Sequence, residues 1–114
     1  MKRILLACSS GMSTSLLVTK MKEEAEKRGE EVEVWAVAQD KAEQQMAHAD
    51  VLLVGPQMRF MKKKFTVKGD QLGVPVDVID AVDYGRVDGT SVLEKALTLI
   101  NEQQRALQEQ GGEK

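Results

Sequence analysis

One short stretch near the start of the chain holds the side chains best suited to chemistry. A cysteine is followed there by small and hydroxylated residues, in the order Cys8, Ser9, Ser10, Gly11, Met12, Ser13, Thr14 and Ser15. Cys8 is the only cysteine of the 114 residues, so neither an internal disulfide nor a cysteine-based zinc site can form. A lone thiol is either a small buried apolar group or a reactive nucleophile, and the hydroxyl-rich neighbours favour the nucleophile.

This stretch suits the binding of an oxyanion. If a strand ends before it and a helix begins after it, backbone N–H groups can point inward, and the helix N-terminus adds about half a positive charge. Gly11 allows a positive φ or a close backbone approach. We therefore expect Cys8 to act as a thiolate on a phosphoryl group, with Ser9 to Ser15 holding its oxygens. The alternative interpretation is a buried cysteine followed by a plain helix cap.

Two absences from the sequence separate a phosphoryl carrier from a hydrolase. Protein tyrosine phosphatases use a Cys-x5-Arg-Ser/Thr loop, in which the arginine grips the phosphoryl oxygens. Here the sixth residue after Cys8 is Thr14, and the chain has no Asp-Pro pair to supply the general acid of those phosphatases. A loop with a thiolate and a cradle but neither of these groups is expected to accept a phosphoryl group and to hydrolyse it slowly.

Alternating strands and helices are expected to position this loop. Apolar runs predict strands over residues 2–7, 31–37, 50–54 and 75–79. The first and third are continuously apolar, as interior strands are, whereas the second and fourth carry acidic residues that suit edges. The pattern predicts an α/β three-layer sandwich with a four-stranded parallel sheet of order 2-1-3-4, flavodoxin-like or low-molecular-weight phosphatase-like. Ligands of such sheets bind where the strand order reverses, which places Cys8 at the site by topology alone.

Helices are predicted between the strands and after the last one. The first is expected to stop before Gly29, and the third to start at Gly55-Pro56. Capping boxes are expected to open the second and last helices, formed by Asp40 with Glu43 and by Ser91 with Glu94. From about Gln103 the chain is polar, so we expect one domain over residues 1–103 and a frayed tail over residues 104–114.

The sequence resembles the enzyme IIB component of the lactose/cellobiose/chitobiose family of bacterial phosphoenolpyruvate-dependent sugar phosphotransferase systems. The specific part of the resemblance is the string Cys8-Ser-Ser-Gly-Met-Ser-Thr-Ser-Leu-Leu-Val18 after a first strand. Supporting pieces are Leu53-Val-Gly-Pro-Gln57, Pro75-Val-Asp-Val-Ile79 and Asp88-Gly89, so that residues 2 to about 100 are covered. Val87 departs from the methionine expected before Asp-Gly, which affects nothing catalytic.

The resemblance implies a phosphotransferase that acts as a carrier. Cys8 would take a phosphoryl group from a phosphohistidine on enzyme IIA. It would then pass the group to a disaccharide of the cellobiose, chitobiose or lactose type, held by the membrane component enzyme IIC. The chain would be monomeric by itself and cytoplasmic, associated with the membrane peripherally through enzyme IIC, and it would need no metal or cofactor.

Composition agrees with these expectations. A net charge of −2 argues against a general nucleic-acid binder. The longest apolar runs are far shorter than the roughly 20 residues that a membrane-spanning helix needs.

Other residues carry weaker signals. Gly55, Pro56 and Gln57 form a neighbouring loop that either starts a helix or faces the phosphoryl group or a partner. Lys62, Lys63 and Lys64 form a solvated face or help to dock a phosphorylated partner. His48, the only histidine, is expected to be a structural residue at or near the surface.

Two other functions stay open from the residues alone. One is a low-molecular-weight phosphatase-like hydrolase, against which the threonine in place of arginine argues. The other is an FMN-binding module, because a Ser/Thr/Gly loop after a first strand can also hold the phosphate of FMN. Against it, the later loops offer only Tyr84 to sandwich a flavin, and Trp35 lies inside the second predicted strand.

Overall fold

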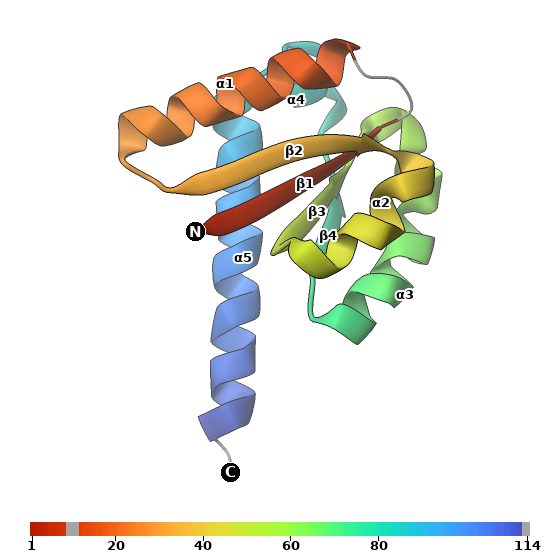
Figure 1. The fold of residues 1–114 in the computed structure, drawn as a ribbon, viewed down its shortest axis with the longest axis vertical. Coiled ribbons are helices and arrows are strands. Elements are labelled where there is room, and N and C mark those ends of the chain that lie inside the picture. Colours follow the sequence, from red (N-terminus) through yellow and green to blue (C-terminus); the bar gives the residue numbers. More distant parts are fainter. Residues whose placement is uncertain (9–11, 113–114) are drawn as a thin grey trace.

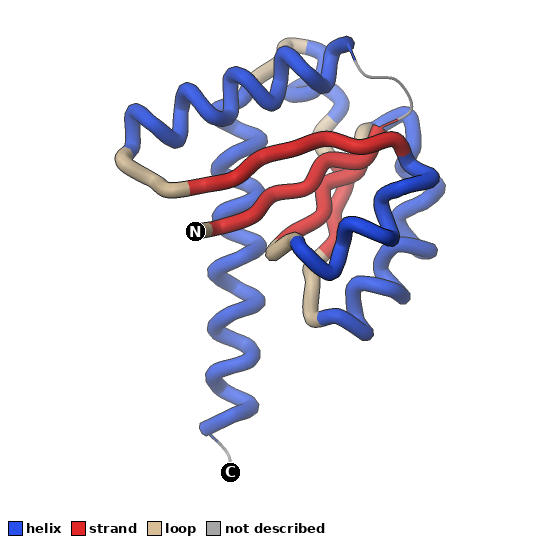
Figure 2. Tube along the Cα trace, in the orientation of Figure 1, coloured by secondary structure: helices blue, strands red, loops and turns tan. Residues whose placement is uncertain are grey.

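The computed structural model describes residues 1–8 and 12–112, with side chains over residues 1–8 and 14–106. Figure 1 and Figure 2 show a sheet with helices on both sides. The elements, with η denoting a 3-10 helix, are β1 (Lys2–Cys8), α1 (Met12–Arg28), β2 (Val32–Ala38), α2 (Gln39–Gln45), η1 (Met46–His48), β3 (Val51–Val54), η2 (Pro56–Met61), α3 (Lys62–Leu72), β4 (Val76–Val78), α4 (Ala81–Gly85) and α5 (Gly89–Gly112).

The strands form one parallel sheet in the order β2-β1-β3-β4, which confirms the predicted order. β1 pairs with β2 from Lys2 beside Val32 to Cys8 beside Ala38. On its other side β1 pairs with β3, and the short strand β4 pairs with β3. The two apolar runs are thus interior strands, buried over most of their length, while the acidic strands are partly exposed edges.

Side-chain alternation along β1 divides the core into two layers. Ile4 and Leu6 pack with the buried faces of α1 and α5, whereas Leu5 and Ala7 pack with α2, η1, η2 and α3. Both faces of the sheet are therefore covered, as the three-layer prediction requires (Figure 1). Each fully buried leucine contributes about 1.5–3 kcal/mol of transfer free energy, so the two layers supply the main driving force for folding.

The helix ends predicted at Gly29 and at Gly55-Pro56 agree with the structure, whereas the predicted capping boxes do not. α1 ends at Arg28 before Gly29, which has a φ of +70°, and Pro56 opens η2. The Asp40–Glu43 capping box is wrong, because β2 runs to Ala38 and leads directly into α2, so the N-cap position falls on a methyl side chain.

The start and the end of the last helix also differ from prediction. The Ser91–Glu94 box is wrong, because the Asp88 carboxylate caps α5: it accepts hydrogen bonds from Ser91 N (3.0 Å) and Ser91 Oγ (2.9 Å). These hydrogen bonds lower the pKa of Asp88. α5 continues to Gly112 instead of ending near Gln103, and it extends past the sheet (Figure 1). The Gln, Glu, Ala, Leu and Arg residues of its C-terminal part are good helix formers, so the polarity of this segment did not predict where the helix ends.

The first prediction concerns the close crossing of α1 and α5 at Gly89. A Cβ atom on Gly89 would lie 2.6 Å from the Lys20 carbonyl carbon and 2.8 Å from Met21 N, both backbone atoms of α1. We expect Gly89→Ala to lower the free energy of unfolding by about 1–3 kcal/mol, because the helices must separate. Urea denaturation measures the change.

Gly85→Ala is the matched control for this crossing. A Cβ atom on Gly85, in α4, would meet nothing within 4 Å. We expect its free energy of unfolding to change by less than about 1 kcal/mol. Equal stability of the two variants would contradict the crowding argument.

Two lysines surround Asp77 on the edge strand β4. Lys62 Nζ lies 3.4 Å from Asp77 Oδ1, and Lys95 Nζ lies 3.5 Å from Asp77 Oδ2. Lys95 Nζ also donates a hydrogen bond of 2.7 Å to the carbonyl oxygen of Val78, which occupies an acceptor of β4. Partial burial raises the pKa of Asp77, but the hydrogen bond from Val78 N and the two lysine charges outweigh it, so the pKa lies below its usual value.

A second prediction follows from the sign of this shift. Because the folded-state pKa is lowered, the contribution of Asp77 is present above its unfolded-state pKa of about 3.9 and is lost as pH falls through the folded-state pKa. The stability difference between the wild type and Asp77→Asn should therefore shrink on acidification from about pH 5 to pH 2. Urea denaturation across this range measures it. Asp70→Asn, at an exposed position of α3, is the control, and an equal pH slope for both variants would refute the assignment.

Candidate functional site

Cys8 is the last residue of β1, at the carboxyl edge of the sheet. It lies beside Ala38 at the end of β2, while the preceding Ala7 pairs with Val54 at the end of β3. The cysteine is therefore at the point between β1 and β3 where the strand order reverses, as topology predicts. Its side chain is only 4% exposed, and Sγ lies 3.9 Å from the carbonyl oxygen of Val37, at the distance of a weak S–H···O hydrogen bond.

The predicted cradle falls partly in a loop and partly in the first turn of α1. Ser9, Ser10 and Gly11 lie outside the described residues. Met12 and Ser13 open α1, and their side chains also lie outside the description. α1 therefore begins four residues after Cys8, and its first turn, Met12–Ser15, contains no acidic residue to offset the positive end of the helix dipole.

The remaining two cradle residues have different environments. Thr14 is 1% exposed, and its Oγ1 lies 3.0 Å from the hydroxyl oxygen of Tyr84. Ser15 is exposed, and its carbonyl oxygen accepts a hydrogen bond from Thr19 Oγ1. Thr14 thus acts in the structure as an anchor for the start of α1, whereas the Ser15 side chain lies at the surface.

Tyr84 reaches Thr14 from α4, which follows the edge strand β4. The Asp80 carboxylate caps α4 by accepting hydrogen bonds from Val82 N (3.0 Å) and Asp83 N (3.2 Å). Tyr84 itself is half-buried against the α1/α5 layer. Capping of α4 and burial of the ring together fix the phenol, so the start of α1 is held to the end of β4. The sequence analysis missed this pair, which joins residues 70 positions apart.

The second predicted loop meets the end of β1. Gly55 N donates a hydrogen bond of 2.9 Å to the carbonyl oxygen of Ala7, the residue before Cys8. Gly55 is buried and Pro56 begins η2. Gln57 is exposed, and its Oε1 lies 2.8 Å from where a Cβ atom on Gly55 would stand, so the amide folds back toward the strand end. The structure therefore joins Gly55 to the end of β1, with the Gln57 amide beside Gly55.

The three consecutive lysines that open α3 (Lys62, Lys63 and Lys64) are exposed, and two of them have acidic partners within the domain. Lys62 pairs with Asp77, and Lys64 Nζ lies 3.9 Å from Glu43 Oε2. Nearby, Met58 is buried while Phe60 is 73% exposed.

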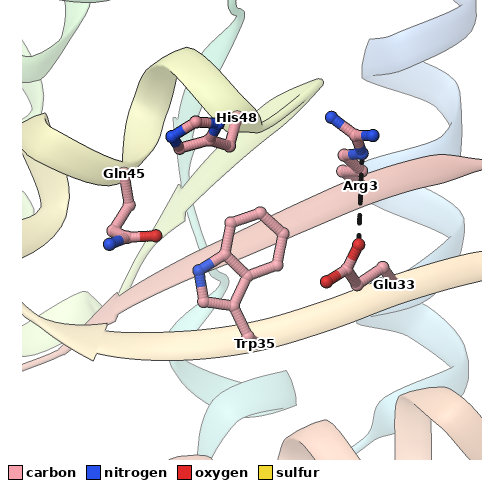
Figure 3. A pocket seen from close by; sticks show the side chains of 5 residues that line it. All are labelled: Arg3, Glu33, Trp35, Gln45 and His48. Carbon is pink, nitrogen blue, oxygen red and sulfur yellow. Dashed lines mark ion pairs between the residues drawn. The ribbon is translucent and has the colours of Figure 1, made fainter.

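The two aromatic residues considered for a flavin site have different environments. The Tyr84 hydroxyl is bonded to Thr14. Trp35 lies within β2 beside Leu5, three register positions before the Cys8–Ala38 pair. His48 is exposed on η1 and lines an open pocket together with Trp35 (Figure 3). Trp35 is therefore not placed to stack on a ligand bound next to Cys8.

Comparison with known proteins identifies the family. The family described as "PTS system, Lactose/Cellobiose specific IIB subunit" matches residues 3–95. The chain belongs to this family. IIB subunits are phosphotransferases that transfer a phosphoryl group to sugar, and membership implies IIA and IIC partners.

Individual relatives of this IIB subunit agree. It is 58% identical over 100 residues to the oligo-beta-mannoside-specific EIIB component of Bacillus subtilis, covering 88% of this chain and 97% of that protein. It is 44% identical over 105 residues to the cellobiose-specific EIIB component of Lactococcus lactis, with the same two coverages.

A solved structure gives the same result for the fold. The cellobiose-specific IIB component of Borrelia burgdorferi superposes with a TM-score of 0.75 at 33% identity, covering 90% of this chain and 94% of that one. The flavodoxin-like fold is thereby confirmed. Among the described residues, the helices are too short or too polar to cross a membrane.

The third prediction concerns the Thr14–Tyr84 hydrogen bond of this IIB subunit. Tyr84→Phe removes one hydroxyl and leaves the buried Thr14 hydroxyl without that partner, which should lower the free energy of unfolding by about 1–3 kcal/mol. Thr14→Val removes the other hydroxyl at similar volume. If the hydrogen bond carries the effect, the double variant should lose less stability than the sum of the single variants in urea denaturation. Additive losses would mean that the two hydroxyls do not interact.

Proposed function

We propose that Cys8 is the residue of this IIB subunit that carries the phosphoryl group. One observation carries the proposal: the only thiol of the chain stands at the carboxyl end of an interior strand, four residues before the start of a long helix. Negative charge is stabilised at such a position by the helix N-terminus. The role of the cradle, from Ser9 to Ser15, is part of the proposal, and so is that of Gly55, Pro56 and Gln57 as a second wall.

The proposed reaction consists of two displacements at phosphorus. In the first, Cys8 Sγ forms a bond to the phosphorus of phosphohistidine on enzyme IIA while the P–N bond breaks. The electron pair returns to the imidazole nitrogen, which takes up the thiol proton. In the second, a sugar hydroxyl oxygen bonds to phosphorus, the S–P bond breaks with its electron pair left on Cys8 Sγ, and the hydroxyl proton restores the thiol. Backbone amides of the cradle offset the charge on the phosphoryl oxygens in both steps.

The partners are proposed to dock in turn over the carboxyl edge of the sheet. Three exposed apolar side chains belong to elements that follow strand ends: Leu16 on α1 (49% exposed), Phe60 on η2 (73%) and Val82 on α4 (57%). Exposed apolar groups near a reactive residue favour transient protein contact. Because one thiol serves both partners, enzymes IIA and IIC are proposed to use overlapping surfaces.

The sugar acceptor is proposed to be a β-linked disaccharide held by enzyme IIC. The two relatives described above are named for oligo-beta-mannosides and for cellobiose, and both sugars are β-linked. The cytoplasmic location, the peripheral attachment to the membrane and the monomeric state of the free chain stay predictions.

The fourth prediction tests Cys8 directly. The chain is incubated with phosphoenolpyruvate, the general phosphotransferase proteins and a cognate enzyme IIA. Mass spectrometry should find one phosphate, on the peptide that contains Cys8. Because Cys8 is the only cysteine, thiol alkylation reports on a single site, and phosphorylation should protect it.

Cys8→Ser should take up no phosphate above background, and circular dichroism checks that the variant is folded. Normal uptake and transfer by Cys8→Ser would disprove the proposal. Rapid release of inorganic phosphate by the wild type would instead support the hydrolase alternative.

A further inference from the structure

An open pocket lies beside the edge strand β2, on the sheet face covered by α2 (Figure 3). Its volume is about 580 Å³, and its lining residues come from four elements: Arg3 on β1, Glu33 and Trp35 on β2, Gln45 on α2 and His48 on η1. This volume falls within the range of about 300–1,000 Å³ that is usual for small-molecule sites. The half-buried indole of Trp35 lies in the middle of the group.

The framework of the pocket is fixed by paired backbone. Arg3 is paired with Glu33, and Leu5 with Trp35, in the β1–β2 ladder. Arg3 N also donates a hydrogen bond of 2.8 Å to the Asp50 carboxylate. The fully buried Met46 anchors η1, which follows α2 directly. The lining side chains therefore project from elements that are held in place without a ligand.

Polar groups in the pocket are free to bind a ligand. In the described part of the chain, the side chains of Trp35, Gln45 and His48 make no hydrogen bond or ion pair. Arg3 and Glu33 form only a long ion pair of 4.0 Å. The indole N–H of Trp35, the amide of Gln45 and the imidazole of His48 thus line one pocket, and they supply both hydrogen-bond donors and acceptors.

The charge of the lining selects the ligand class. Arg3 and Glu33 balance each other, so the lining favours neither an anion nor a cation. A neutral polyol both donates and accepts hydrogen bonds, as this mixed lining requires. The C–H face of a pyranose carries slight positive charge, which complements the negative face of an indole.

We propose that this pocket binds a pyranose sugar, stacked on Trp35 and hydrogen-bonded to Gln45, His48 and the Arg3–Glu33 pair. The site is separate from the proposed phosphoryl site. Trp35, on which the sugar stacks, lies three register positions from the Cys8–Ala38 pair, about 10 Å, and Arg3 lies five positions from Cys8, about 16 Å. A pyranose ring stacked on Trp35 therefore does not contact the thiol. Because the pocket is open, the expected dissociation constant is about 1 mM or weaker.

The fifth prediction uses the single tryptophan of the chain as the probe. Titration with cellobiose or mannobiose should change the emission of Trp35 and approach saturation, whereas glycerol at the same concentrations should not. Gln45→Ala should weaken binding about threefold to tenfold through the loss of a hydrogen bond. Gln44→Ala is the matched control, because Gln44 is the exposed neighbour on α2 that does not line the pocket, and it should bind as the wild type does.

Two results would overturn the proposal. One is an emission that does not change with either sugar at concentrations well above the expected dissociation constant. The other is an equal response of Gln45→Ala and Gln44→Ala, since the amide that lines the pocket would then contribute nothing to binding. Phosphate uptake by Cys8 is measured separately in both variants and should equal that of the wild type. Failure of sugar binding therefore leaves the proposed role of Cys8 untouched.

Discussion

β1 is buried on both faces, and this burial determines where the chemistry can occur. Ile4, Leu5, Leu6 and Ala7 are each at most 1% exposed, so the strand requires a neighbour on each edge and a helical layer on each face. Parallel neighbours bring the ends of β1, β2 and β3 to the same edge of the sheet. The next residue of the strand, Cys8, is then carried to that edge by the hydrophobic effect on the residues before it. Placement of the thiol needs no interaction of its own.

The start of α1 is positioned by polar contacts that begin at β4, the edge strand opposite β2. Ile79 N donates a hydrogen bond of 2.8 Å to the carbonyl oxygen of Val54, which joins the end of β4 to β3. Asp80 then caps α4, and Tyr84 reaches Thr14. A short helix of marginal stability thereby becomes a fixed support, because its first turn is capped and its aromatic side chain is half-buried. The strand ends and the helix start around Cys8 are connected through protein groups that do not react.

Local patterns in the sequence were sufficient to predict the strand order of the sheet and the position of Cys8. The apolar runs around Leu5 and Leu52 and the acidic residues of the other strands gave the strand order, and that order placed Cys8. The predicted helix caps were wrong by two or three residues: the N-cap of α2 is Ala38 rather than Asp40, and Asp88 rather than Ser91 is the acceptor for α5. The first of these shifts depends on where β2 stops pairing, which a single sequence does not encode locally.

Contacts between residues far apart in the sequence could not be predicted from local sequence patterns. From the sequence, Tyr84 was considered only as an aromatic residue that could sandwich a flavin, because no residue near it in the sequence indicates Thr14 as its partner. The pocket at Trp35 could not be predicted for the same reason. It forms because odd-numbered residues of two strands and the end of α2 face one another, which requires the register of β1 and β2 as well as the sheet order.

The pocket at Trp35 and the site at Cys8 share β1 and β2, and the stiffness of these strands limits how far one site can influence the other. A ligand shifts an equilibrium only if it binds two conformations with different affinities. β1 and β2 pair without interruption from Lys2 to Cys8, and the interior strand is packed on both faces. Close-packed interiors of this kind resist continuous deformation, so a sugar on Trp35 has no second arrangement of β1 to select. An effect of sugar on phosphoryl transfer would therefore require the bound sugar to obstruct a docked partner, and not to change the structure around Cys8.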